Sequence, residues 1–117
     1  MQRHCLAKPG AWADFPWEHD YPVIKVGAGP RGKIFAFLGS SSVGVKAAAT
    51  REEADEWLAR YPGDATVMAY IGRSGWNTLA FGGAIPDEEL LEAVDDSYRL
   101  VVVKLAKKDR PEGWESR

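Results

Sequence analysis

The sequence has little cysteine, little histidine and no long hydrophobic run, and each shortage excludes a class of protein. Cys5 is the only cysteine in 117 residues, which excludes an internal disulfide or a cysteine-based metal cage and suits a reducing compartment. Apolar runs such as residues 100–103 are far shorter than the roughly 20 residues that span a bilayer. The first ten residues also lack the apolar core of a signal peptide. We therefore expect a cytoplasmic protein without a membrane partner.

Neither sign of charge dominates the chain. The sequence holds 15 Lys and Arg residues against 17 Asp and Glu residues, for a formal net charge of −2. A strong global attraction to nucleic acid or to a membrane is thereby excluded, so any basic surface must be local. The length indicates a single domain over residues 1–117. Such a domain is large enough to bury a stable core without disulfides or a structural metal. The polar segment 109–117 is expected to be a loose tail unless Trp114 anchors it.

The strongest pattern runs from Pro86 to Lys108 and predicts a long amphipathic helix. Pro86 suits a first helical position, and three acidic residues follow it at the positive end of the helix dipole. The Asp-Asp-Ser sequence at 95–97 is a candidate interruption, because these side chains compete for backbone hydrogen bonds. The apolar residues that fall on one side of a helical wheel are Leu90, Leu91, Val94, Tyr98, Val101, Val102 and Leu105.

Alternating apolar residues predict three strands, at 23–26, 33–38 and 43–46. Short links rich in glycine or serine join them, so we expect antiparallel neighbours.

Further elements follow and precede these strands. Thr50 opens a capping box and a helix that Pro62 stops, and strand signals return at 65–71 and 76–81. Residues 1–8 have the pattern of a helix end, whereas 11–21 is interpreted as an aromatic, turn-rich loop. The predicted fold is α+β, an antiparallel sheet of about five strands packed against helices.

The segment 27–32, G-A-G-P-R-G, matches the glycine spacing of a dinucleotide fingerprint. That site needs a helix directly after the third glycine, because the helix N-terminus holds the pyrophosphate. The segment 33–38 has a strand pattern instead. We therefore interpret the glycines as a flexible hairpin and expect no nucleotide cofactor.

The segment 95–98, Asp-Asp-Ser-Tyr, brings carboxylates, a hydroxyl and a phenol together. Both histidines, His4 and His19, lie near the N-terminus, so Ser97 has no base close to it in the sequence. We interpret the segment as a helix start or kink with Tyr98 in the core, and we expect no enzymatic activity.

Acidic residues cluster at 52–56 and 87–92, and their carboxylates are able to bind a hard cation. Both clusters open predicted helices, where the helix dipole favours carboxylates in any case. His4, Cys5 and His19 lack the spacing of metal ligands. We therefore expect no metal site.

Two sets of residues are candidates for an interaction surface. Basic residues lie on or beside the predicted strands, as in sheet-type nucleic-acid binders, although a solvated sheet face shows the same pattern. Aromatic residues offer a second hypothesis, a patch for a protein partner or small ligand, although such residues more often seal the edge of a core. The basic set is Lys25, Lys33, Lys46 and Arg73, and the aromatic set is Trp12, Phe15, Trp17 and Trp76.

Several short motifs occur in an order that resembles the MmcQ/YjbR family of small bacterial domains. They are C-L-A-K-P-G-A at 5–11, F-P-W at 15–17, P-V-I-K-V-G at 22–27, G-K-I-F-A at 32–36, Y-P-G at 61–63, W-N-T at 76–78, I-P-D-E-E-L-L at 85–91 and D-S-Y-R-L-V-V at 96–102. The resemblance implies a frataxin-like (CyaY-like) α+β fold with a double-wing likeness. It also implies a DNA-binding role rather than a defined enzymatic reaction. In addition, it implies a longer N-terminal helix than residues 1–7 provide.

Overall fold

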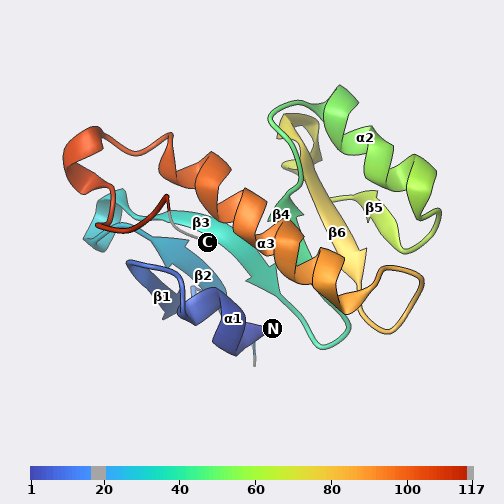
Figure 1. Ribbon diagram of the computed structural model, residues 1–117, viewed down its shortest axis with the longest axis horizontal. Helices are drawn as coiled ribbons and strands as arrows, with labels where there is room; N and C mark the ends of the chain where they lie inside the picture. The colour runs from blue at the N-terminus through green and yellow to red at the C-terminus, as the bar shows by residue number, and fades with distance from the viewer. Residues whose placement is uncertain (17–20, 116–117) are drawn as a thin grey trace.

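The computed structural model, which describes residues 1–16 and 21–115, consists of a β-sheet layer and a helical layer (Figure 1). In these residues six strands form one antiparallel sheet, ordered β1-β2-β3-β4-β6-β5. The predicted α+β class and the antiparallel sheet are confirmed, with one strand more than expected. The strands are β1 (Ala11–Asp14), β2 (Val23–Val26), β3 (Lys33–Leu38), β4 (Ser42–Lys46), β5 (Ala65–Val67) and β6 (Trp76–Ala80); the helices are α1 (Gln2–Leu6), α2 (Arg51–Arg60) and α3 (Asp87–Val102), with 3₁₀ turns η1 (Gly29–Arg31), η2 (Gly72–Ser74) and η3 (Lys107–Asp109).

The additional strand, β1, lies within the segment that the sequence indicated to be a loop. It pairs with β2 in a register that runs from Ala11 opposite Val26 to Asp14 opposite Val23. All four residues of β1 are half-buried, so no clear alternation of apolar and polar residues marks the strand in the sequence. Pairing with β2, rather than a local pattern, makes this segment extended.

The helix α3 is continuous through the Asp-Asp-Ser sequence but ends at Val102, six residues before the predicted end. The chain then tightens into 3₁₀-type turns, with the Lys104 amide donating to Val101 and the Leu105 amide donating to Val102. Consecutive β-branched residues at the end of α3 disfavour a longer helix. Leu105 is nevertheless buried.

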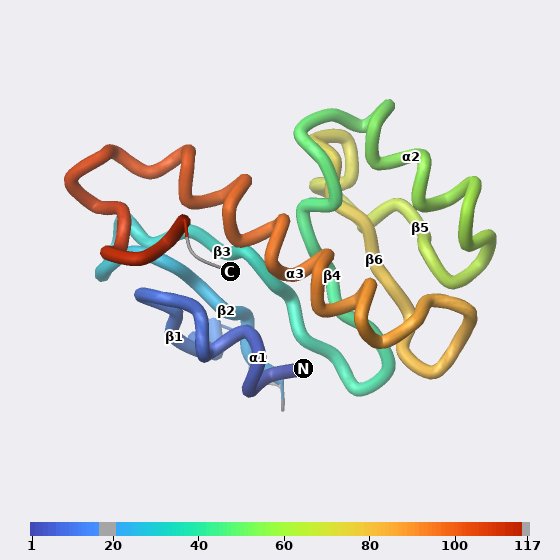
Figure 2. Tube along the Cα trace, in the orientation of Figure 1, coloured from blue at the N-terminus to red at the C-terminus, as the bar shows by residue number. Residues whose placement is uncertain are grey.

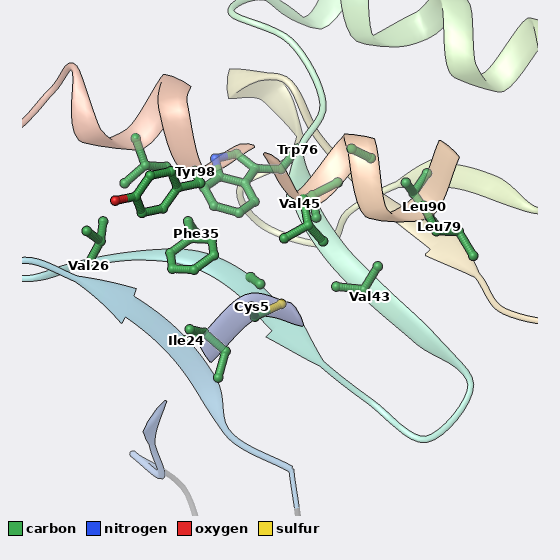
Figure 3. Packing of buried hydrophobic residues seen from close by; sticks show 14 of the residues in the cluster. Cys5, Ile24, Val26, Phe35, Val43, Val45, Trp76, Leu79, Leu90 and Tyr98 are labelled. Atoms are coloured by element: carbon green, nitrogen blue, oxygen red, sulfur yellow. The ribbon is translucent and has the colours of Figure 1, made fainter. Parts of the chain in front are cut away.

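All three helices cover the same face of the sheet, and α3 crosses it diagonally (Figure 2). Asn77 of β6 donates a hydrogen bond of 2.9 Å to the carbonyl of Ala54, which fixes α2 to this face. His4 and Lys8 contact Asp95, which fixes α1 beside α3. The core lies between the helices and the sheet (Figure 3). The other face, which we call the open face, has no helix over it in the described residues.

A β-bulge in β3 divides its aromatic residues between the two faces. Ile24 pairs with Ala36 and Lys25 pairs with Ile34, which leaves Phe35 as the extra residue. Phe35 is buried edge-to-face against Tyr98, with ring centroids 5.2 Å apart (Figure 3). Phe37 lies opposite Gly44 and packs on the open side against Trp76 instead.

No helix in the described part of the chain combines the length and the apolar character needed to cross a bilayer.

Candidate functional site

The sheet forks between β3 and β4. Direct pairing of these strands ends at Ala36 and Val45, although β3 continues beside β2 and β4 continues beside β6. At the next position the Ser97 hydroxyl of α3 lies between the strands. It accepts a hydrogen bond of 2.9 Å from the Lys46 amide and donates one of 2.6 Å to the Phe35 carbonyl. Ser97 therefore replaces a direct strand-to-strand bond and holds the fork open.

This role of Ser97 was not predicted, because the sequence indicated only a helix start or kink at this position. The residue is completely buried in the middle of α3. Its two partners are 62 and 51 residues away in the chain, so no local signal points to them.

Replacing Ser97 with alanine is expected to lower the free energy of unfolding by about 1–3 kcal/mol, because buried backbone groups lose their partner. Urea denaturation followed by tryptophan fluorescence measures this change. Ser41→Ala is the matched control, since Ser41 is exposed and its loss should stay within about 0.5 kcal/mol. Equal effects of the two substitutions would contradict the proposed role of Ser97.

Beyond Ser97 the fork opens into a groove of about 510 Å³, which we call the fork groove. This volume lies in the range of small-ligand sites. The residues Leu100 and Val101 of α3 line it together with residues from both arms of the fork. Its other apolar residues are Ile34, Phe37, Ile71 and Trp76, and its charged residues are Lys25, Lys33, Lys46 and Lys104. The groove thus combines an apolar lining with four positive charges.

The four lysines differ in their partners. Lys25 forms a 2.8 Å ion pair with Asp14 and lies 5.3 Å from the centre of the Trp12 ring. The Lys46 ammonium donates a 2.5 Å hydrogen bond to the Ser74 carbonyl. Burial, and secondarily the charge of Lys104, lower the pKa of Lys46 below its usual value. In the described residues Lys33 and Lys104 form no ion pair, so their charges are available to a ligand.

The structure brings three of the four predicted basic residues, Lys25, Lys33 and Lys46, to this one groove. Lys25 reaches it from the open face, opposite Ile34, whereas Lys33 lies opposite the buried Val26, on the helical face of the same arm of the fork. The fourth predicted residue, Arg73, is exposed in η2 and is not among the lining residues. Lys104 was not predicted as a site residue, because its position after a helix is explained equally well by the helix dipole.

The predicted aromatic residues are only partly gathered. Trp76 lines the groove and is 9% exposed, with its ring centre 5.5 Å from that of Phe37. Trp12 borders the groove through Lys25, and its indole nitrogen donates to the Gly27 carbonyl at 2.8 Å. Phe15 is 56% exposed after the end of β1. Trp17 lies outside the described residues.

Other candidate chemistry from the sequence has structural explanations. The glycine segment forms the link between β2 and β3, and a strand rather than an α-helix follows Gly32. Cys5 is buried, and burial raises the pKa of its thiol to about 11. Tyr98 is buried in the core as predicted. In the residues that the structure describes, no three His, Cys, Asp or Glu side chains come together as metal ligands.

Comparison with known proteins identifies relatives across nearly the whole chain. The protein is 26% identical over 114 residues to the uncharacterized protein YjbR of Escherichia coli strain K12, covering 94% of this chain and 91% of that protein. It matches YjbR of Escherichia coli O157:H7 to the same extent.

A solved structure has the same fold. The crystal structure of Deinococcus radiodurans protein DR2400, described as a DUF419 domain, superposes with a TM-score of 0.81 at 24% identity. The match covers 93% of this chain and 81% of that one. The model of the YjbR family itself matches residues 6–100, which include all six strands and most of α3. The chain therefore belongs to the YjbR family.

Proposed function

We propose that the fork groove binds nucleic acid weakly and without sequence preference. The observation that supports this function is the convergence of four lysines, from β2, β3, β4 and the turn after α3, on one groove. Lysine side chains placed in this way contact phosphates, and such contacts position a nucleic acid without reading its sequence. Arg73, beside the groove in η2, remains a predicted additional contact.

The net charge of the protein and the existing partners of two groove lysines explain why the binding is expected to be weak. The net charge of −2 means that the remaining surface repels phosphates. Asp14 already neutralises Lys25, and Lys46 already has a backbone partner, so a ligand must compete with both. We expect a dissociation constant no tighter than about 10⁻⁴–10⁻⁶ M at physiological salt, as for non-specific binders.

Salt titration tests the proposal directly. With about four phosphates neutralised, the logarithm of the affinity for a short DNA should fall with the logarithm of salt concentration at a slope of about −3 to −4. Fluorescence anisotropy at several salt concentrations gives this slope. Lys33→Gln or Lys104→Gln should each reduce its magnitude by about one and weaken binding to all DNA sequences equally.

The charge-matched control is Arg3→Gln. Arg3 is exposed on α1, which packs on the helical face of the sheet, so its loss should leave the slope unchanged. An absence of binding at low salt would refute the proposal. Equal effects of Arg3→Gln and Lys33→Gln would assign the attraction to overall charge rather than to the groove.

The second candidate is a surface for a protein or small ligand, and the exposed ring of Phe15 favours it. Large exposed aromatic groups are enriched at such interfaces. Salt separates the two functions, because an aromatic interface lacks the steep salt dependence of phosphate contacts. A partner whose affinity is insensitive to salt and is lost in Phe15→Ala would support this candidate.

A further inference from the structure

The turn between β5 and η2 displays apolar side chains to solvent beside the fork groove. In residues 67–71, which comprise the last residue of β5 and this turn, the exposed fractions are 50% for Val67, 104% for Tyr70 and 37% for Ile71. Ile71 also lines the groove, and Tyr70 directly precedes Ile71 in the chain. Exposed apolar groups gathered in this way mark interaction sites. We call this segment the Tyr70 turn.

The backbone of the Tyr70 turn is held in an uncommon conformation. Tyr70 has a φ of 67°, the one positive φ outside glycine among the described residues. Residues with a Cβ seldom adopt this region, because the Cβ crowds the backbone. Hydrogen bonds from the Met68 amide to the Trp76 carbonyl and from the Ile71 amide to the Ala69 carbonyl fix the turn on both sides. Strained backbone that is held by its surroundings is concentrated at ligand sites.

The chemistry of the groove selects among nucleic acids. Ile34, Phe37 and Trp76 give it apolar surface between the lysines, which a ligand made only of phosphates leaves unused. A duplex keeps the faces of its bases stacked inside, so that it offers phosphates, sugars and base edges but no free base face. A single strand offers phosphates and free base faces together, and proteins bind such strands with positive grooves and aromatic side chains.

We infer that the ligand of the fork groove is single-stranded nucleic acid, with one base against the apolar lining and a neighbouring base stacked on Tyr70. This inference rests on the proposed nucleic-acid function and deepens it. The lysines supply the sequence-independent attraction, and the Tyr70 turn supplies the preference for unpaired bases. The stacking is sequence-tolerant, since every base has a face that can stack.

Three fluorescent probes of equal length test the inference by anisotropy: single-stranded oligothymidine, its duplex with oligoadenosine, and an abasic sugar-phosphate strand. The oligothymidine should bind at least about 5-fold more tightly than the abasic strand. Tyr70→Ala should weaken its binding by about 5-fold to 100-fold, the effect of removing one base–aromatic stack. Binding of the abasic strand should not change.

Tyr70→Phe is the matched control, because it keeps the ring and should retain full affinity. A thermal melt of each variant verifies folding, which the complete exposure of Tyr70 favours. If all three probes bind equally and Tyr70→Ala has no effect, the inference of single-strand selectivity is wrong, but the proposed electrostatic binding of nucleic acid stands. If no probe binds at low salt, both proposals are wrong.

Discussion

Replacing Phe35 with alanine is expected to lower the free energy of unfolding by about 3–5 kcal/mol. Phe35 is fully buried and lies edge-to-face against Tyr98 between the sheet and α3 (Figure 3). The substitution removes both the buried surface of the ring and its aromatic contact, and the surrounding strands cannot fully close the cavity. Urea denaturation monitored by circular dichroism measures the loss.

Phe37→Ala is the matched control, because Phe37 is the same residue type in the same strand. The bulge places it on the open face, where it is only partly buried. Its loss should therefore be smaller than that of Phe35. A larger loss at Phe37 would mean that the bulge, and the division of the two rings between opposite faces, is wrong.

Replacing Leu105 with alanine is expected to cost about 2–5 kcal/mol, although Leu105 lies beyond the end of α3. Leu105 is 4% exposed and packs closely on Gly27 at the start of the link between β2 and β3. It therefore closes the end of the core that α3 no longer covers. Chemical denaturation measures the effect.

Val103→Ala is the control for Leu105, since Val103 is only two residues away but 45% exposed. Its effect should stay within about 0.5 kcal/mol, as for most surface substitutions. A loss of less than about 0.5 kcal/mol at Leu105 would place this residue at the surface and contradict the described end of the core.

Elements with a strong local period were predicted from the sequence. The strands β2, β3, β4 and β6 and the helix α2 lie at or within two residues of their predicted bounds. The turn residues around them are specific, and local periodicity is sufficient to identify such segments. Short elements were less predictable: β1 depends on its partner strand, and β5 stops at Val67 because the Tyr70 turn follows.

The candidate site was predicted only in part because it depends on long-range contacts. Lys25, Lys33 and Lys46 were recognised individually, but their gathering at one groove requires the fork, which Ser97 of α3 bridges through long-range hydrogen bonds. In β3 a simple alternation would place Phe35 and Phe37 on the same face. The bulge that separates them arises from pairing with β2, so it leaves no signal within the strand itself.

The position of α3 near the end of the chain has a consequence for folding during synthesis on the ribosome. The strands β1 to β4 pair with their sequence neighbours, so these four of the six strands are able to form their part of the sheet early in synthesis. The part of its apolar face that α3 covers stays exposed until α3 emerges, and α3 contacts residues as distant as His4, 91 positions before Asp95. A nascent chain that stalls before α3 therefore presents the apolar surface that α3 normally covers, and exposed surface of this kind aggregates or recruits chaperones.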